Sequence, residues 1–449
     1  MTSKFLLALL AAAGAFGQDI SGYVVGGRQK PSIAVPDLRG SGEAQRLMDA
    51  FNKTLWSELA GSGALRMVEK SFYPLDVPQQ PADFKPPAPL PHGPWLTDWS
   101  RPPVNANYLA IGYAAVQDRQ LVLRGWLFNA GQTDLTAAQV FGRLYFGSVD
   151  EAGAKKVARQ FAAEILQQFG VKSLEGSRIY FVSDRTGHKE IWSMDYDGSN
   201  QRQVTNYRAL SQSPAVSLDG KLIACDTLAD NGEKIETWQI RMRSSEGARL
   251  PFKNPKAPTN ITPEFTPDGK RILFSSSISG YAQIYSADLE GNDLQRITNT
   301  EAIDVSPRVN PKNGRDVLFI SDRSGAQQLW RMNIDGGDQD MLTDDEGSVS
   351  NPSWRPDGQM IAFAWTRGYE RGDFNIFIMD IAAREPIQLT KDSGINENPW
   401  WGPDGLHIVF SSRRSGTYQI YSMLADGTNL KPLTTQGNNI QPVWVAAGN

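Results

Sequence analysis

The chain is short of the residues on which many enzymatic sites depend. Its 449 residues include one cysteine, Cys225, and three histidines, His92, His188 and His407. A single cysteine excludes an internal disulfide, and its place in an apolar run predicts a small buried side chain. No two histidines are spaced as metal ligands, and no Gly-x-Ser-x-Gly nucleophile motif occurs. The composition therefore favours a binding protein over an enzyme, and we predict no cofactor and no metal.

Strong net charge and long apolar runs are also lacking. The formal net charge is −4, so nucleic acid is not an expected partner. One short apolar run, Phe5–Ala13, follows Lys4 and precedes the small-residue sequence Ala15–Gly17. This pattern predicts a secretory signal peptide at residues 1–17, with cleavage before Gln18 and no lipid anchor, because no cysteine follows the run. No later segment holds 18 consecutive apolar residues, so the exported mature protein is expected to be soluble, without a transmembrane span.

What the chain has in abundance is a repeated phrase of proline, one further residue and an apolar residue. It occurs six times at intervals of 43 to 49 residues, beginning at Pro214, Pro263, Pro307, Pro352, Pro399 and Pro442. Sustained repeats of this length are typical of solenoids, propellers and other arrays. More than half of the chain is therefore predicted to be one repetitive structure.

Each repeat has an internal order that predicts four short strands. The proline phrase leads to a tight-turn dipeptide, such as Asp268-Gly269 or Asp357-Gly358. Two β-prone runs separated by a polar loop come next, and a last short run ends in threonine, as at Leu342-Thr343. Alternation and turn spacing of this kind indicate antiparallel four-stranded blades.

The two ends of the repeat region indicate how the structure closes. The first unit, Ser177–Thr205, has no proline strand before it, and the last proline strand, Gln441–Val445, has no strands after it. Pairing these two fragments completes a sixth blade and removes the open edges that invite aggregation. We therefore predict a six-bladed β-propeller over residues 177–449, closed by the C-terminal strand. The alternative, an open β array, leaves both fragments unpaired.

The apolar residue two places after each proline is expected on the innermost strand, packed between blades. These residues are Val216, Phe265, Val309, Trp354, Trp401 and Trp444. The three tryptophans also admit a second interpretation, an aromatic cage for a ligand. Packing is favoured because six equivalent positions share the apolar character.

Residues 28–172 are predicted to form a separate α/β domain, preceded by an extended segment at 18–27. An apolar stripe at helical spacing runs through Glu43–Leu59, and Ser148 with Glu151 fits a capping box at the start of a second long helix. A proline-dense stretch, residues 78–103, is expected to be irregular. Strands are predicted at 32–35, 65–68, 108–116, 120–129 and 138–147.

The order of an export signal, a small α/β domain and six blades resembles the TolB family, the periplasmic component of the Tol-Pal system. The phrases Ser183–Gly187 (Ser-Asp-Arg-Thr-Gly) and Ser353–Gly358 (Ser-Trp-Arg-Pro-Asp-Gly) are typical of TolB-like repeats. The resemblance implies a periplasmic, non-enzymatic protein that binds the lipoprotein Pal at one mouth of the propeller. It also implies a role in outer-membrane integrity and cell division, and docking of the mature N-terminus into TolA.

Carried onto this chain, the Pal-binding mouth consists of residues that precede the repeated prolines and of loops that open on the same face. The first group is Asn260, Thr262, Asp304, Val305, Ser306, Asn351, Asn396, Glu397 and Asn398, and the second is Asp184, Arg185, Asp322, Arg323, Arg413 and Arg414. Mixed charges and amides suit a polar protein interface. The alternative is local, because such Asp and Arg residues often bond the turn backbone or each other.

The TolA-binding segment implied by the resemblance is Gln18, Asp19, Ile20, Ser21, Gly22, Tyr23, Val24 and Val25. The segment is extended and β-prone, and its sequence departs from the family pattern. A disordered processed terminus is the other interpretation.

We expect a monomer whose partners are a Pal-like lipoprotein and a TolA-like protein. The alternative function is that of an exported propeller enzyme, such as a polysaccharide lyase or a glycoside hydrolase.

Overall fold

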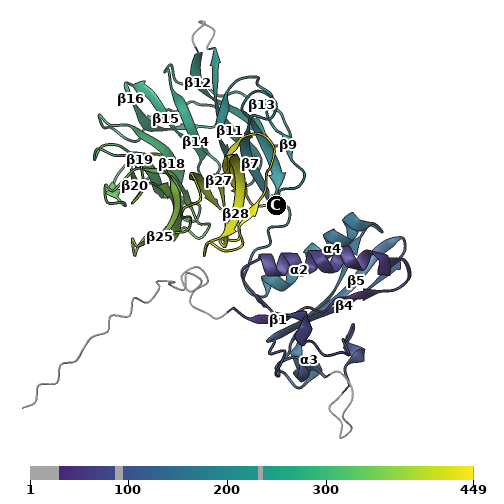
Figure 1. Ribbon diagram of the computed structural model, residues 1–449. Helices are drawn as coiled ribbons and strands as arrows, with labels where there is room; N and C mark the ends of the chain where they lie inside the picture. Colours follow the sequence, from purple (N-terminus) through teal and green to yellow (C-terminus); the bar gives the residue numbers. More distant parts are fainter. Residues whose placement is uncertain (1–29, 86–94, 231–235, 448–449) are drawn as a thin grey trace, which may run out of the picture.

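The computed structural model describes residues 30–85, 95–230 and 236–447. The predicted signal peptide and the extended segment at 18–27 lie outside these ranges. The described chain forms a ring of β-sheet blades and a smaller N-terminal unit of sheet and helices (Figure 1). No helix in the described ranges has the length and apolar character needed to cross a membrane.

The N-terminal unit is a mixed sheet covered by two helices, α2 (Met48–Gly61) and α4 (Glu151–Gln167). Its strand order is β3-β1-β4-β5-β6, with β2 paired to β4. The helices lie side by side over one face (Figure 1), where Phe51, Leu55 and Phe161 join the buried core. The strands are β1 (Ser32–Ala34), β2 (Arg39–Gly40), β3 (Arg66–Met67), β4 (Tyr108–Gln117), β5 (Gln120–Asn129) and β6 (Gln139–Gly147).

Short helical turns complete the unit, and two details differ from the sequence prediction. The predicted helix at 43–59 begins as a 3-10 turn, and the capping box at Ser148 is wrong. Asp150 caps α4 instead, because its carboxylate accepts the Gly153 N–H at 2.7 Å and the Ser148 hydroxyl at 2.7 Å. The short helices are α3 (Leu135–Ala138) and the 3-10 turns Gly42–Leu47, Lys70–Phe72, Pro81–Asp83 and Leu96–Asp98.

The ring contains six antiparallel four-stranded sheets, as the repeat predicts. In five of them, four consecutive strands run in sequence order from the axis outward. Their strands are β10 (Ser211–Val216), β11 (Leu222–Asp230), β12 (Glu236–Ser244), β13 (Arg249–Leu250), β14 (Asn260–Phe265), β15 (Arg271–Ser279), β16 (Tyr281–Asp288), β17 (Gln295–Arg296), β18 (Asp304–Val309), β19 (Asp316–Ser321), β20 (Gln328–Asn333), β21 (Asp340–Met341), β22 (Val349–Trp354), β23 (Met360–Trp365), β24 (Asn375–Asp380), β25 (Pro386–Gln388), β26 (Asn396–Trp401), β27 (His407–Ser415), β28 (Thr417–Leu424) and β29 (Lys431–Pro432).

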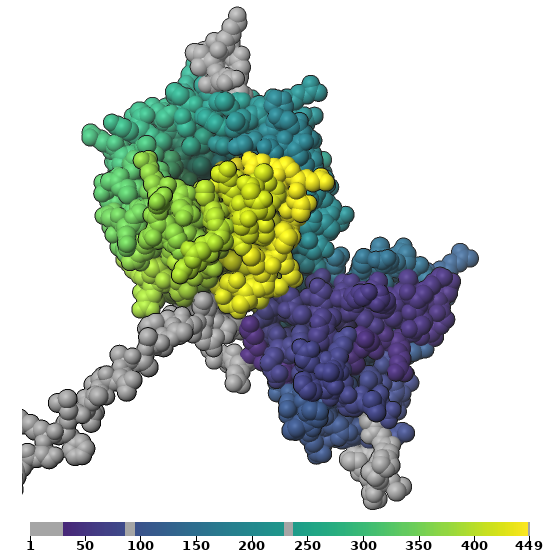
Figure 2. All heavy atoms as spheres, in the orientation of Figure 1, coloured from purple at the N-terminus to yellow at the C-terminus, as the bar shows by residue number. Residues whose placement is uncertain are grey.

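The sixth blade joins the two ends of the repeat region. The closing strand β30 (Asn439–Val445) pairs antiparallel with β7 (Arg178–Ser183), which continues to β8 (Glu190–Asp195) and β9 (Arg202–Gln203). The predicted closure is therefore confirmed, and the open array is wrong. Figure 2 shows the C-terminal part of the ring, in yellow, against the N-terminal unit, in purple.

Candidate functional site

All six innermost strands begin at one mouth of the ring, which we call the pre-proline mouth. The first residue of each strand is an anchor that is 0% exposed: Ser211, Asn260, Asp304, Val349, Asn396 and Asn439. The polar anchor side chains make hydrogen bonds inside the ring, some within their own blade and some to the preceding blade. For example, Asn260 accepts the Ser276 hydroxyl at 2.8 Å, and Asn396 donates to the Gly394 carbonyl at 2.6 Å. Three residues predicted for the mouth, Asn260, Asp304 and Asn396, therefore have no surface that a partner can touch.

Three predicted loop arginines hold anchors by one shared geometry. Arg323 donates to both carboxylate oxygens of Asp304, at 2.8 and 2.9 Å, and its guanidinium lies 4.7 Å from the Trp330 ring centroid. The same arrangement joins Arg185 to Asn439 over Trp192, and Arg414 to Asn396 over Tyr421. Charge-assisted bonds and cation–π contact fix these side chains in place. These arginines therefore shape the rim from within.

The predicted aspartates of the same loops are also engaged in local bonds. Asp184 accepts the Asn438 N–H at 2.8 Å, and Asp322 accepts the Ile303 N–H at 2.7 Å. Each bond ties a loop to the residue just before an innermost strand. The local alternative considered for these positions thus describes their geometry well.

A repeated backbone distortion creates the surface of the mouth. The residue before each repeated proline is left-handed, with φ between 50° and 57°: Ser213, Thr262, Ser306, Asn351, Asn398 and Gln441. Every innermost strand shifts register at this point. Residues before proline normally adopt extended conformations, and such strained backbone is found at functional sites. The bulge leaves two partly exposed residues per blade facing the mouth.

Seven of the predicted residues lie on this surface. They are the half-buried Thr262, Val305, Ser306, Asn351, Glu397 and Asn398, and the exposed Arg413. Six equivalent residues escaped the sequence analysis: Gln212, Ser213, Ile261, Ser350, Ile440 and Gln441. Extending the prediction to the two residues before every repeated proline would have included all six.

Side-chain bonds join neighbouring blades around most of the mouth. The bulge N–H of Ser213 donates to Gln441 at 2.8 Å, and that of Ser306 donates to Thr262 at 3.3 Å. The belt is interrupted at β22, where the buried Ser350 hydroxyl oxygen has no hydrogen-bond partner within the described residues.

The mouth is divided into an apolar arc and a polar arc. Around the ring the second strand positions are Ile440, Gln212, Ile261, Val305, Ser350 and Glu397, so the apolar arc of Ile440, Ile261 and Val305 is interrupted by Gln212, and Ser350 and Glu397 lie on the other side. Glu397 accepts the Tyr418 hydroxyl at 2.7 Å. Exposed apolar side chains extend the apolar arc outward: Leu210 (37%), Ile278 (42%), Tyr281 (56%) and Ile303 (41%). Exposed apolar clusters rimmed by polar groups are typical of protein-binding surfaces.

A buried carboxylate supports the apolar arc from below. Asp226 accepts the Thr262 bulge N–H at 3.0 Å through one oxygen, and its other oxygen has no partner in the described chain. Burial raises the pKa of Asp226 to about 7, although the Thr262 bond lowers it. Ionised Asp226 is therefore disfavoured in the folded ring.

Asp226→Asn is expected to stabilise the protein at pH 8 and to change little at pH 4. The folded pKa of Asp226 lies above its ordinary value of 3.8, so its contribution to stability is greatest at low pH and falls as pH rises to about 7. Removing the charge should therefore raise the thermal midpoint by several degrees at pH 8. Calorimetry at both pH values tests this. An equal change of the thermal midpoint at pH 4 and pH 8 would show that burial does not disfavour the ionised carboxylate.

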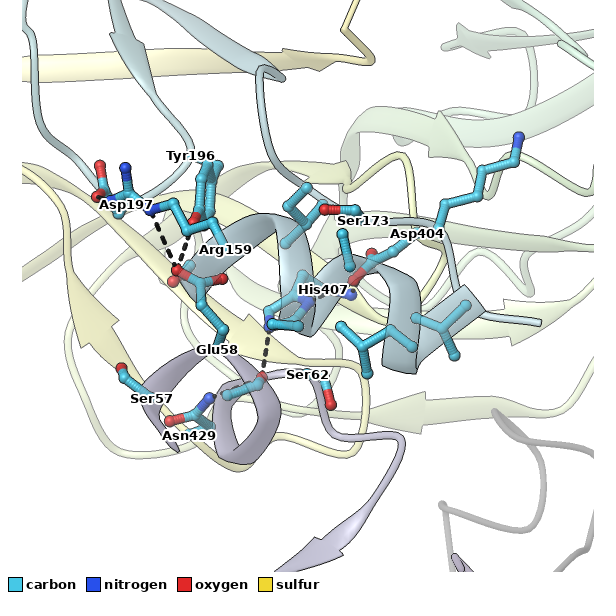
Figure 3. A pocket seen from close by; sticks show the side chains of 18 of the residues that line it. Ser57, Glu58, Ser62, Arg159, Ser173, Tyr196, Asp197, Asp404, His407 and Asn429 are labelled. Atoms are coloured by element: carbon cyan, nitrogen blue, oxygen red, sulfur yellow. Dashed lines mark hydrogen bonds and ion pairs between the residues drawn. The ribbon is translucent and has the colours of Figure 1, made fainter. Parts of the chain in front are cut away.

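The contact between the N-terminal unit and the ring is a second polar site, with a cavity of about 410 Å³ (Figure 3). His407 lies within hydrogen-bond distance of the Asp404 carboxylate, at 2.6 Å, and of the Gly61 carbonyl at the end of α2, at 3.0 Å. Arg159 on α4 pairs with Asp197 at 2.7 Å. These contacts fix the unit against the β26–β29 blade and the closing blade.

The tryptophans predicted between blades are buried and also border a cavity on the ring axis. Trp354, Trp401 and Trp444 line this space of about 180 Å³. Inside it, Arg308 pairs with Glu264 at 3.2 Å and accepts the Trp354 indole N–H through its backbone carbonyl at 2.9 Å. Packing between blades is thus confirmed, and the cavity is held by bonds among its own residues.

The fold and the mouth define a β-propeller protein that carries an α/β unit and presents a rim of strained strand starts at one mouth of the ring. Residues 166–363 and 338–449 match the family model described as the TolB beta propeller domain. The chain belongs to the TolB family.

Relatives and solved structures agree with this family. A TolB homologue of Chlorobium chlorochromatii is 33% identical over 209 residues, 46% of this chain and 44% of the relative. A Tol-Pal system protein TolB of Desulfosudis oleivorans is 32% identical over 197 residues, 43% of this chain and 42% of the relative. These matches span less than half of each relative's length. The crystal structure of TolB from Acinetobacter baumannii superposes with a TM-score of 0.73 at 22% identity, covering 93% of this chain and 97% of that one.

Proposed function

We propose that this chain is a periplasmic, non-enzymatic scaffold of a Tol-Pal system and binds a Pal-like lipoprotein at the pre-proline mouth. Membership of the TolB family and similarity to Tol-Pal system proteins support a role in such a system. The observation that carries the site is the division of the mouth into an apolar and a polar arc on a rigid, bonded rim. Apolar contact area supplies affinity, and the polar arc supplies orientation.

The residues assigned to the interface are those that a partner can touch. The apolar arc contributes Ile261, Val305 and Ile440, and the polar arc contributes Asn351 and Glu397. Ser350 lies within the polar arc, but its hydroxyl oxygen is buried and is not assigned to the interface. The buried anchors and their arginines hold this surface in shape. A preformed rim of this kind lowers the entropic cost of binding.

The rest of the proposed role follows the family. The segment Gln18–Val25, outside the described residues, is proposed to dock into a TolA-like protein, and the exported chain would then support outer-membrane integrity and cell division. A non-enzymatic role is supported by the buried acids. Glu264 is paired with Arg308, and Asp226 holds a bulge N–H, so both carboxylates serve the ring's own structure.

Ile261→Glu and Glu397→Lys are each expected to weaken binding of the soluble domain of a Pal-like lipoprotein by about tenfold or more, equivalent to about 1.4 kcal/mol. The first places a charge in the apolar arc, and the second reverses the polar arc. Leu294→Glu is the matched control, because Leu294 is exposed in the turn between β16 and β17, away from the mouth. Calorimetric titration measures the affinities, and thermal unfolding checks that each variant is folded.

Two outcomes would contradict the site. Binding by the wild type that both mouth variants retain would place the partner elsewhere on the molecule. A loss of affinity in Leu294→Glu equal to that of the mouth variants would show a general effect of added charge. Absence of wild-type binding to any Pal-like domain would count against the proposed function itself.

A further inference from the structure

The N-terminal sheet ends in an open strand. β6 (Gln139–Gly147) pairs only with β5, so the backbone groups on its outer edge have no strand partner within the described residues. Proteins usually protect such edges with proline, lysine or short length. β6 has nine residues and neither proline nor lysine. Leu144 and Phe146 are 49% and 50% exposed along it.

A groove of about 770 Å³ runs beside this open strand. Its lining comes from β6, from α4 and from the linker to the ring, with Tyr145, Phe146, Gln160, Glu164, Gln167 and Gly170–Ser173. An exposed edge strand next to a helix is the arrangement by which some domains take up an extended peptide as an added strand. Main-chain bonds to the edge give affinity, and alternate side chains enter the groove.

The charges around the groove indicate the chemistry of its occupant. Arg143 on β6 is paired with Glu164 on α4 at 2.8 Å, so these two charges offset each other. Lys172 in the groove wall forms no ion pair within the described residues. The exposed Arg124, opposite Leu144 on β5, also forms none, but it lies outside the groove lining, on the sheet face away from α4. The positive charge of Lys172 favours an acidic residue in the bound segment.

We infer that β6 and its groove bind an extended segment of a partner protein, with apolar residues at alternate positions and an acidic residue near Lys172. The segment adds to the sheet as the strand after β6. The linker residues Gly170–Ser173 line the groove, so the bound strand lies against the linker to the ring. This site is in the N-terminal unit and is separate from the pre-proline mouth.

The test starts from a displayed library of random linear peptides selected on the full chain. Selected peptides are expected to alternate apolar residues and to carry Asp or Glu. A selected peptide should slow hydrogen exchange at residues 139–147. Backbone N-methylation at every second residue should abolish its binding in one register and spare it in the other, because only one edge of an added strand faces β6.

The double variant Leu144→Lys, Phe146→Lys is expected to bind the selected peptide at least about tenfold more weakly, since both side chains are exposed and lysine protects strand edges. Leu75→Lys, at a fully exposed site outside the groove, is the control and should bind normally. Failure to enrich any peptide, equal binding by both variants, or loss in both methylation registers would overturn the inference. The inference would also be overturned if β6 were protected from hydrogen exchange in the absence of peptide. A second copy of the chain could cause this at high protein concentration, or residues 18–27 could, in which case their removal would abolish the protection.

Discussion

Asp304→Ala is expected to destabilise the ring by about 3–5 kcal/mol, the usual cost of leaving one member of a buried ion pair alone. The Asp304 side chain is 0% exposed and receives two bonds from Arg323, whose side chain is only 17% exposed. Thr300 donates a third bond at 3.0 Å. Alanine leaves the Arg323 guanidinium in place over Trp330 without its carboxylate, and it frees the start of β18.

Asp304→Asn is the matched variant, because other blades carry asparagine at the same position. Asn396 and Asn439 each accept an arginine at 2.9 Å through the side-chain oxygen. Asparagine at 304 should therefore keep one of the two Arg323 bonds and cost much less than alanine. Denaturant unfolding measures both variants, with Asn351→Ala at the rim as a control for surface change. An alanine variant as stable as the asparagine variant would show that the ion pair contributes little.

This expectation also separates structure from binding at the mouth. Asp304→Asn should retain affinity for a Pal-like domain, because it keeps β18 in place and changes no exposed group. Ile261→Glu should instead lose affinity and keep stability. The sequence prediction placed Asp304 and its half-buried neighbour Val305 in one site. The structure separates them, since Asp304 is fully buried and Val305 keeps some exposed surface.

The ring was predictable from sequence because its signal is repeated and its ends complement each other. Ser177–Thr205 and Gln441–Val445 are each incomplete, and only their pairing satisfies strand edges. The exposure of the rim residues was less predictable. A residue before proline is expected to be extended, whereas Thr262, Ser306 and Asn398 are left-handed and change which neighbours face the mouth.

The contact between the two parts of the chain had no local signal at all. His407 falls in an ordinary strand run, and its partner Gly61 is 346 residues away in sequence. A lone histidine in a strand indicates neither a bond to another unit nor a buried charge. Only the three-dimensional arrangement brings the carbonyl at the end of α2 to the imidazole (Figure 3).

His407→Ala is expected to destabilise the protein by about 3–5 kcal/mol at pH 5–6, because Asp404, with a side chain 2% exposed, loses its buried partner. Burial lowers the pKa of His407, but the Asp404 carboxylate and the Gly61 carbonyl together raise it by more. The pKa therefore ends above its ordinary value of 6.5. The pKa of Asp404 ends below its ordinary value of 3.8, despite burial, because of His407. The raised pKa of His407 and the lowered pKa of Asp404 both indicate a charged imidazolium that donates a hydrogen bond from each ring nitrogen.

The pH dependence isolates this charge from simple packing. A raised histidine pKa gives stability that is complete below pH 6.5 and is lost as pH rises through the folded value, whereas the Asp404 contribution is lost as pH falls below 3.8. The cost of His407→Ala should therefore be largest between these limits and smaller at pH 9. Contact with the Trp444 ring, at 6.1 Å between centroids, is lost equally at every pH.

Calorimetric unfolding of the full chain at pH 6 and pH 9 measures the difference, and the exposed His188→Ala should be unaffected at both. Lys431 is the other charged group that acts on His407, and it lowers the pKa of His407. A cost that is the same at both pH values would leave packing as the whole contribution. A cost that falls at pH 9 would mean that a buried ion pair in the ring holds the end of α2, and with it the orientation of the N-terminal unit.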